Sequence, residues 1–169
     1  MNKKIIIVRH AKAAIAENFG NDFDRPLTSQ GKADAEAMGK QLKKNEILPD
    51  LIISSPAKRT RQTAKRLAIA IGYNVDEILW VEKLYHCTPE VIENVIEEVT
   101  DSVNTLMIVA HNPGMSEFSN MIDPSFRLMH LPTCGTVVVN TDTVSWSDFM
   151  NSKRKVILYK YPRQNNDTK

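Results

Sequence analysis

The run Lys4-Ile5-Ile6-Ile7-Val8 stands near the start of the chain and leads directly into Arg9-His10-Ala11. It is rich in β-branched residues and does not alternate with polar ones, which is typical of a strand covered on both faces. Leu51-Ile52-Ile53 and residues 106–110 repeat the pattern. Strands of this kind occur in parallel sheets with helices on both sides, so these runs predict an α/β fold.

Helical patterns separate the apolar runs. Residues 28–44 carry apolar side chains near the helical period, and Thr28 or Ser29 can cap that helix. A second helix is indicated by an apolar stripe with i, i+3, i+4, i+7 spacing. The stripe consists of Ala64, Leu67, Ala68 and Ile71. Thr88-Pro89 predicts the start of a third helix, with threonine as the N-cap and proline at the first helical position.

Two late strands complete the expected architecture. Residues 136–140 and 156–161 follow one another without a helical pattern between them, so we expect them to pair antiparallel at one sheet edge. The fold class predicted is a three-layer α/β/α arrangement with a mainly parallel central sheet and an antiparallel edge strand. We expect a single domain over residues 1–162 and a flexible C-terminal tail over residues 163–169.

Composition narrows the classes of protein. The chain has 169 residues, of which 42% are hydrophobic and 25% charged, as in a globular domain. The net charge of +2 gives no reason to expect nucleic acid or a membrane surface as partner. The apolar stretch Ile5–Val8 is too short for a signal peptide or a membrane span, so we expect a cytoplasmic protein. Cys87 and Cys134 lack metal-site or redox spacing and are expected to be buried thiols.

Polar residues follow each predicted parallel strand. Arg9-His10 follows the first strand, a segment from Ser54 to Thr63 follows the second, and His111-Asn112 follows the third. Ligands of open α/β sheets bind outside the carboxyl ends of the strands, so these groups are expected to meet. A phosphoryl group needs several fixed donors, and the planar fork of arginine suits its oxygens. Arg59 also falls in the first turn of a helix, where the helix dipole favours an anion.

His10 differs from the arginines because a neutral imidazole can attack phosphorus and form a covalent intermediate. Arg9 and Arg59 would neutralise the charge that builds up on the phosphoryl oxygens, and His111 would donate a further hydrogen bond. These four residues are the predicted catalytic group, and Arg9, Arg59, His111 and Asn112 are the predicted phosphate ligands. We expect neither a metal ion nor another cofactor, because the histidines lack the short spacing of a metal pair.

These motifs resemble those of the histidine phosphatase superfamily, whose fold is shared with cofactor-dependent phosphoglycerate mutases. The matching residues are Arg9-His10-Ala11, Ser55-Pro56-x-x-Arg59-x-x-Gln62-Thr63 and His111-Asn112-Pro113. Asp24-Arg25-Pro26-Leu27-Thr28-x-x-Gly31 adds a match to the branch typified by the bacterial phosphohistidine phosphatase SixA. The resemblance implies that His10 accepts the phosphoryl group and that Arg9, Arg59 and His111 form its pocket.

The chain departs from the superfamily pattern at two places. Ala11 replaces the usual glycine, which adds one methyl group. Residues 83–87 contain no carboxylate where many members carry a general acid, so Glu82 and His86 are the candidate proton donors. An alkyl phosphate expels an alkoxide that needs a proton, whereas phosphohistidine can release a neutral imidazole unaided. The predicted substrate is therefore phosphohistidine on a protein such as a histidine phosphotransfer domain, and the short chain leaves little length for a lid.

Other functions remain open. A phosphatase for small phosphate esters would use Glu82 or His86 as proton donor, and a phosphate-binding module would use the arginines without turnover. A cysteine phosphatase is disfavoured because neither cysteine is followed by arginine six positions later. Asp22-Phe23-Asp24 resembles an aspartyl-phosphate motif, but no apolar strand precedes it. The sequence indicates no oligomeric state.

Overall fold

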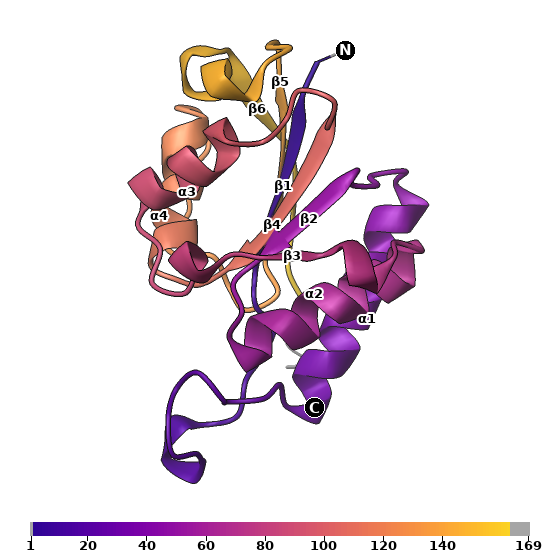
Figure 1. The fold of residues 1–169 in the computed structure, drawn as a ribbon, viewed down its shortest axis with the longest axis vertical. Helices are drawn as coiled ribbons and strands as arrows, with labels where there is room; N and C mark the ends of the chain where they lie inside the picture. The colour runs from indigo at the N-terminus through magenta and orange to yellow at the C-terminus, as the bar shows by residue number, and fades with distance from the viewer. Residues whose placement is uncertain (1, 163–169) are drawn as a thin grey trace, which may run out of the picture.

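The computed structural model describes residues 2–162, and its central feature is one six-stranded sheet with strand order β3-β2-β4-β1-β5-β6 (Figure 1). The predicted flexible tail, residues 163–169, lies outside the described residues. The strands are β1 (Lys4–Arg9), β2 (Leu51–Ser54), β3 (Leu79–Trp80), β4 (Thr105–Ala110), β5 (Thr136–Thr141) and β6 (Arg154–Lys160). The α-helices are α1 (Ser29–Lys44), α2 (Lys58–Ile71), α3 (Pro89–Glu97) and α4 (Gly114–Ile122). The short 3₁₀ helices are η1 (Ala16–Asn18), η2 (Val75–Glu77), η3 (Glu82–Leu84) and η4 (Trp146–Asn151).

The strand directions confirm the predicted mainly parallel sheet. β1 pairs parallel with β4, and β2 pairs parallel with β4 and β3. β5 pairs antiparallel with both β1 and β6, so the two late strands form the predicted antiparallel pair with β6 at the edge. The four 3₁₀ helices of the described residues were not expected from the sequence, and η4 lies between β5 and β6, where no helical pattern was expected. Two further elements were also not expected. β3 has only two residues, and α4 begins at Gly114, shortly after the polar residues that follow β4.

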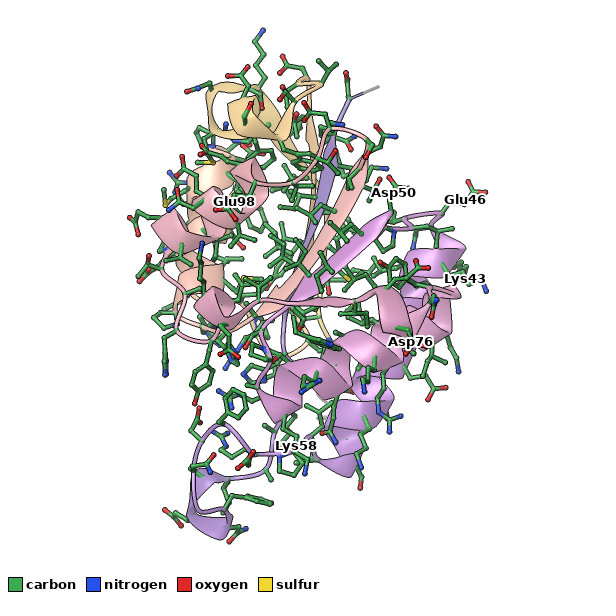
Figure 2. All side chains as sticks on the ribbon, viewed as in Figure 1. Lys43, Glu46, Asp50, Lys58, Asp76 and Glu98 are labelled. Atoms are coloured by element: carbon green, nitrogen blue, oxygen red, sulfur yellow. The ribbon has the colours of Figure 1, made fainter. Side chains whose placement is uncertain are left out.

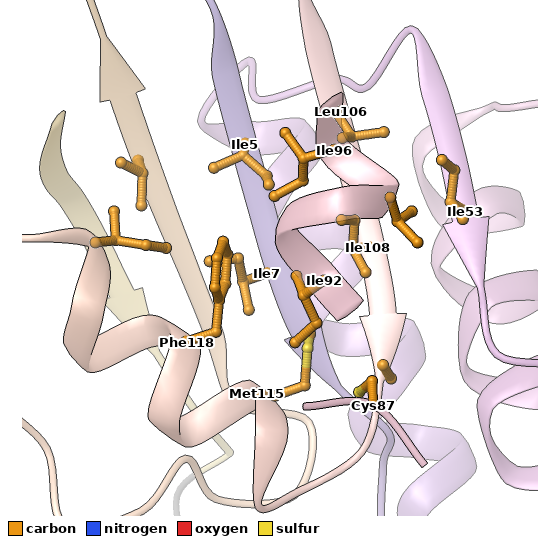
Figure 3. Close-up of a cluster of buried hydrophobic side chains, with 14 of the residues drawn as sticks. Ile5, Ile7, Ile53, Cys87, Ile92, Ile96, Leu106, Ile108, Met115 and Phe118 are labelled. Atoms are coloured by element: carbon orange, nitrogen blue, oxygen red, sulfur yellow. The ribbon is translucent and has the colours of Figure 1, made fainter. Parts of the chain in front are cut away.

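The two faces of β1 explain its unbroken apolar sequence. Ile5 and Ile7 are fully buried in a cluster with side chains from α3 and α4, among them Ile92, Met115 and Phe118 (Figure 3). Ile6 and Val8 are fully buried in a second cluster, which contains side chains of α1 and α2. Burying each such side chain contributes about 1.5–3 kcal/mol. Because both faces are covered, the strand has no polar face that would alternate with the apolar one.

Threonine side chains cap the N-termini of α1 and α3. The Thr28 hydroxyl accepts a hydrogen bond from Gly31 N at 3.0 Å, so Thr28, and not Ser29, is the N-cap of α1. Thr88 caps α3 in the same way, with Pro89 at the first helical position as expected. Each such cap stabilises its helix by about 1 kcal/mol. The Thr28 hydroxyl also donates to Lys12 O at 3.2 Å, which ties the start of α1 to the residues following β1.

The charged side chains labelled in Figure 2, including Lys43, Asp50 and Glu98, are all exposed. Cys87 and Cys134 are free and buried, as expected. Among residues 2–162, no helix is both long and apolar enough to cross a bilayer. The same residues contain no group of three or more His, Cys, Asp or Glu side chains arranged to hold a metal ion.

Candidate active site

The carboxyl ends of three neighbouring parallel strands meet at one edge of the sheet. Arg9 lies opposite Ala110, and Ser54 lies opposite Val109, so the residues that follow these strands start from adjacent positions. The rings of His10 and His111 consequently lie 5.4 Å apart between centroids. His10, Arg59 and His111 are only 8%, 6% and 5% exposed. The predicted strand-end cluster therefore forms, and it is largely shielded from water.

The imidazole of His10 is held in one tautomer. Its Nδ1 lies 2.7 Å from the carbonyl oxygen of Ala11. A carbonyl can only accept, so Nδ1 carries the proton and Nε2 of the neutral ring keeps its lone pair. Burial lowers the pKa of His10 to about 4, with the charges of Arg59, Arg9 and Arg25 adding to the effect and the Ala11 hydrogen bond opposing it. The ring is thus neutral and nucleophilic at neutral pH.

The terminal nitrogens of the Arg9 and Arg59 guanidinium groups donate hydrogen bonds to other residues of the protein. Arg9 Nη1 donates to the carbonyl oxygen of Leu131 at 2.9 Å. Arg59 Nη1 donates to the carbonyl oxygen of Asp22 at 2.8 Å, and its Nη2 donates to the Asp22 carboxylate at 2.9 Å. The Nε of each arginine is buried and has no hydrogen-bond partner among the described residues. Burial lowers the pKa of Arg9, and the nearby charge of Arg59 lowers it further, as expected of two cations that share one site.

His111 is oriented by Ser55. Its Nε2 lies 2.7 Å from the Ser55 hydroxyl oxygen, which also accepts from Ala57 N at 3.4 Å. The described residues offer the hydroxyl proton no other acceptor, so we assign Ser55 as the donor and His111 Nε2 as the acceptor. Nδ1 then carries the ring proton, and this atom is buried without a hydrogen-bond partner in residues 2–162. Burial, followed by Arg59 and His10, lowers the pKa of His111 to about 3, so the ring is a neutral donor.

Asn112 is committed to internal hydrogen bonds. Its Nδ2 donates to the Leu131 carbonyl at 2.9 Å, the same oxygen that holds Arg9. Its Oδ1 accepts from both the amide and the hydroxyl of Ser116. The side chain therefore supports the loop that orients Arg9, and its expected role as a direct phosphate ligand stays a prediction.

The two candidate proton donors differ in their position. Glu82 is exposed at the start of η3, and no described residue pairs with its carboxylate. His86 is also exposed, but its ring packs against Tyr85 at 4.0 Å between centroids. Tyr85 in turn meets the ring of His111 edge-on at 5.6 Å. His86 is thus connected with His111 of the strand-end cluster through the ring of Tyr85. Among the described residues, no such contact connects the Glu82 side chain with the cluster.

Asp22 belongs to the cluster although its sequence context did not indicate this. Its carboxylate receives hydrogen bonds from Arg59, Tyr85 and Arg25, each at 2.8–2.9 Å. Asp22 stands two residues before the motif that contains Arg25. Its segment has no helical or strand periodicity from which its position could be predicted. The sequence indicates Ser55 only as part of a motif, because no local pattern shows that its hydroxyl meets His111.

Comparison with known proteins identifies the family of the chain. The family model described as histidine phosphatase superfamily (branch 1) matches residues 5–83. An uncharacterised chloroplastic protein of Arabidopsis thaliana is 30% identical over 156 residues, which make up 88% of this chain and 71% of that protein.

Solved structures share the whole fold. A protein of Agrobacterium tumefaciens, provisionally assigned as the phosphohistidine phosphatase SixA, is 29% identical with a TM-score of 0.79, and the match covers 96% of this chain and 100% of that one. The protein histidine phosphatase SixA in complex with tungstate has the same fold, with 19% identity and a TM-score of 0.78 over 94% of this chain and 96% of that one. The architecture is phosphoglycerate mutase-like, and the chain belongs to branch 1 of the histidine phosphatase superfamily.

Proposed function

We propose that this protein is a phosphatase that transfers a phosphoryl group to Nε2 of His10 and then to water, and that its substrate is phosphohistidine on another protein. Arg9, Arg59 and His111 bind the phosphoryl oxygens in this proposal. A histidine phosphotransfer domain is the kind of partner that carries such a group.

One observation gives the strongest support for a phosphoryl-binding site around His10. The buried side-chain nitrogens without a partner in the described residues are Arg9 Nε, Arg59 Nε and His111 Nδ1. All three belong to residues that surround His10, and an unpaired buried donor costs about 1–3 kcal/mol. An anion with several acceptor oxygens satisfies such donors together, and two arginine side chains supply the charge that a dianion requires.

The first step breaks one phosphorus–nitrogen bond and forms another. The Nε2 lone pair of His10 attacks phosphorus, and the electron pair of the breaking bond goes to the departing imidazole of the substrate. His10 keeps its Nδ1 proton, which stays hydrogen-bonded to Ala11 O. The phosphorylated ring therefore carries a positive charge and is itself a good leaving group.

The second step returns His10 to its starting state. A water molecule attacks phosphorus, the bond to Nε2 breaks, and the electron pair returns to His10. The proton lost by water ends on the released phosphate. The neutral Nδ1–H donor of His111 and the Nε–H groups of the arginines stabilise the phosphoryl oxygens in both steps.

The groups near the site favour a substrate that needs no proton donor. Partial burial raises the pKa of Asp22, but hydrogen bonds from Tyr85, Arg59 and Arg25 outweigh this and hold it well below its usual range. Desolvation and the bond to Asp22 raise the pKa of Tyr85, so its proton is held. Asp22 is thus ionised and Tyr85 a weak acid at neutral pH. A phosphohistidine whose second ring nitrogen is protonated leaves as neutral imidazole without help.

The deciding experiment compares two substrates in the presence of a chelator. We expect a phosphorylated histidine phosphotransfer domain to be dephosphorylated with a higher kcat/KM than glycerol phosphate or a sugar phosphate. H10Q should show no turnover, and mass spectrometry after an alkaline quench should find phosphate on His10 of the wild type. Faster turnover of the small esters would instead favour the small-ester phosphatase with His86 as donor. Phosphate binding without turnover of either class would favour the binding module.

A further inference from the structure

We infer that Asp22 is a positioning residue that holds Arg59 with its Nε–H edge turned toward the phosphoryl group. The inference rests on the proposed phosphatase function and adds to it a residue outside the strand-end motifs. Asp22 acts through Arg59 and is not expected to touch the substrate.

The hydrogen bonds of Arg59 show which edge of the guanidinium is engaged. Its Nη1 and Nη2 donate to the backbone carbonyl and the carboxylate of Asp22, so one residue takes the end-on pair of donors. A guanidinium has five N–H donors in a fixed planar fork. The edge made of Nε–H and the second Nη2–H therefore remains for an anion, and Nε is buried with no partner in the part of the chain that the structure describes. Binding at the far end thus determines the direction in which the free edge points.

Asp22 is itself fixed from several sides. The Tyr85 hydroxyl donates to the same carboxylate oxygen as Arg59, at 2.8 Å. Arg25 Nη1 donates to the other oxygen at 2.8 Å, while Arg25 Nε donates to Ala14 O. The carboxylate is thereby joined to the segments before α1 and after η3, and it cannot turn without breaking these bonds.

The backbone around Asp22 is clamped as well. Phe23 O accepts from the amide of Lys58, the first residue of α2. Ala13 and Leu27 form an antiparallel bridge that closes the base of the segment, which extends away from the sheet in Figure 1. Leu27 N also donates to Gln62 of α2 at 2.7 Å. The segment is therefore docked on the same helix that carries Arg59, which keeps Asp22 and Arg59 in register.

The negative charge of the Asp22 carboxylate is a second argument for its role in positioning Arg59. Arg9, Arg59 and Arg25 all lower the pKa of His10 through their charge, so three cations act on one small site. Arg59 is almost fully buried, with a side chain 7% exposed, whereas that of Asp22 is 42% exposed. A carboxylate beside Arg59 offsets the repulsion from Arg9, which would otherwise drive the long arginine side chain away from the anion.

The test compares the same substitution at two positions of one segment. Asp22→Asn removes the charge, whereas Asp24→Asn is the matched control because, among residues 2–162, the Asp24 carboxylate accepts a hydrogen bond only from Asn21. We expect Asp22→Asn to lower kcat/KM for an aryl phosphate about 100-fold, the usual consequence of a small misplacement of a substrate-positioning group. It should also weaken binding of inorganic phosphate, measured by calorimetry. Asp24→Asn should change neither quantity by more than about twofold.

A double-mutant cycle separates positioning from a structural role. In an Arg59→Ala background, Asp22→Asn should have almost no further effect on phosphate binding, because the residue that it orients is gone. Thermal unfolding of each variant shows whether it is folded. Equal effects of Asp22→Asn with and without Arg59 would overturn the inference, as would unchanged phosphate binding in a folded Asp22→Asn variant.

Phosphate binding keeps this inference distinct from the proposed function. If the wild type turned over no phosphate compound, the phosphatase proposal would fail. Weaker phosphate binding by Asp22→Asn, lost in the Arg59→Ala background, would still support the positioning role.

Discussion

Ser55 and His111 follow two neighbouring parallel strands, and the Ser55 hydroxyl oxygen lies 2.7 Å from His111 Nε2. The Ala57 amide also donates to that oxygen, and because the described residues offer the serine proton no other acceptor, we assign the serine as donor to the imidazole. A neutral histidine has one N–H, so the contact selects which nitrogen can donate to a phosphoryl oxygen. One hydroxyl thus decides whether His111 acts as a donor in the site.

Ser55→Ala should therefore reduce turnover without removing any group that touches the substrate. Once the serine proton is gone, His111 can move its own proton to Nε2 and present a lone pair to the anion. We expect kcat to fall about 10- to 100-fold, no more than the loss of a whole oxyanion donor costs. Ser54→Ala is the control, because it removes a neighbouring hydroxyl, which donates to the Ser55 carbonyl. The ¹⁵N shifts of His111 should change tautomer in Ser55→Ala, and an unchanged tautomer would contradict the assignment.

The pKa of His10 should be about 4 in the free protein, compared with the usual 6.5. The reason is mainly burial, and NMR of the ring protons can follow the titration. The unfolded chain binds a proton at pH below 6.5, whereas the folded one does so only near 4, so stability falls as pH drops through this window. H10Q should lose less stability than the wild type between pH 6.5 and 4. Inorganic phosphate should raise the pKa of His10, because an adjacent anion favours the imidazolium.

The strand-end residues of the site could be predicted from the sequence because parallel strands place their carboxyl ends side by side. His10 and His111 both stand at the ends of apolar runs that local pattern identifies. Their convergence needs only the topology of an α/β sheet. The apolar clusters on both faces were predictable for the same reason, since the runs contain no polar alternation.

Asp22 could not be predicted in this way. Its partners Arg59 and Tyr85 are 37 and 63 residues away, and no periodic element fixes the path between them. The same limit explains why β3 could not be predicted. It has two residues and is defined by its pairing with β2, not by its own composition. Long-range hydrogen bonds and very short strands leave no local periodicity in the sequence.

Arg59→Lys should impair the protein far more than Arg61→Lys. Lysine has no fork, so it cannot bind Asp22 with one edge and an anion with the other. We expect kcat/KM to fall about 100-fold or more, with weaker phosphate binding. Arg61, two positions later, is exposed and lies over the ring of Trp80 at 4.7 Å, so its replacement should leave both quantities near wild type. Similar losses in both variants would point to a general effect of charge rather than a specific fork at Arg59.

Gly31→Ala should destabilise the protein, although alanine is the better helix former by about 1 kcal/mol. An alanine Cβ at this position would lie 2.1 Å from the carbonyl oxygen of Lys12, a backbone atom held by Thr28 through two hydrogen bonds. The clash forces the chain beside His10 to shift, and overpacking of this kind costs about 1–3 kcal/mol. Each kcal/mol should lower Tm by about 2–4 °C in a domain of this size, as thermal unfolding can measure. Gly20→Ala is the matched control, because nothing lies within 4 Å of its added methyl group and its Tm should remain near that of the wild type. A Gly31→Ala variant as stable as Gly20→Ala would mean that the Lys12 backbone can move freely, and the close approach of α1 to the residues behind His10 would then have no role in holding the site.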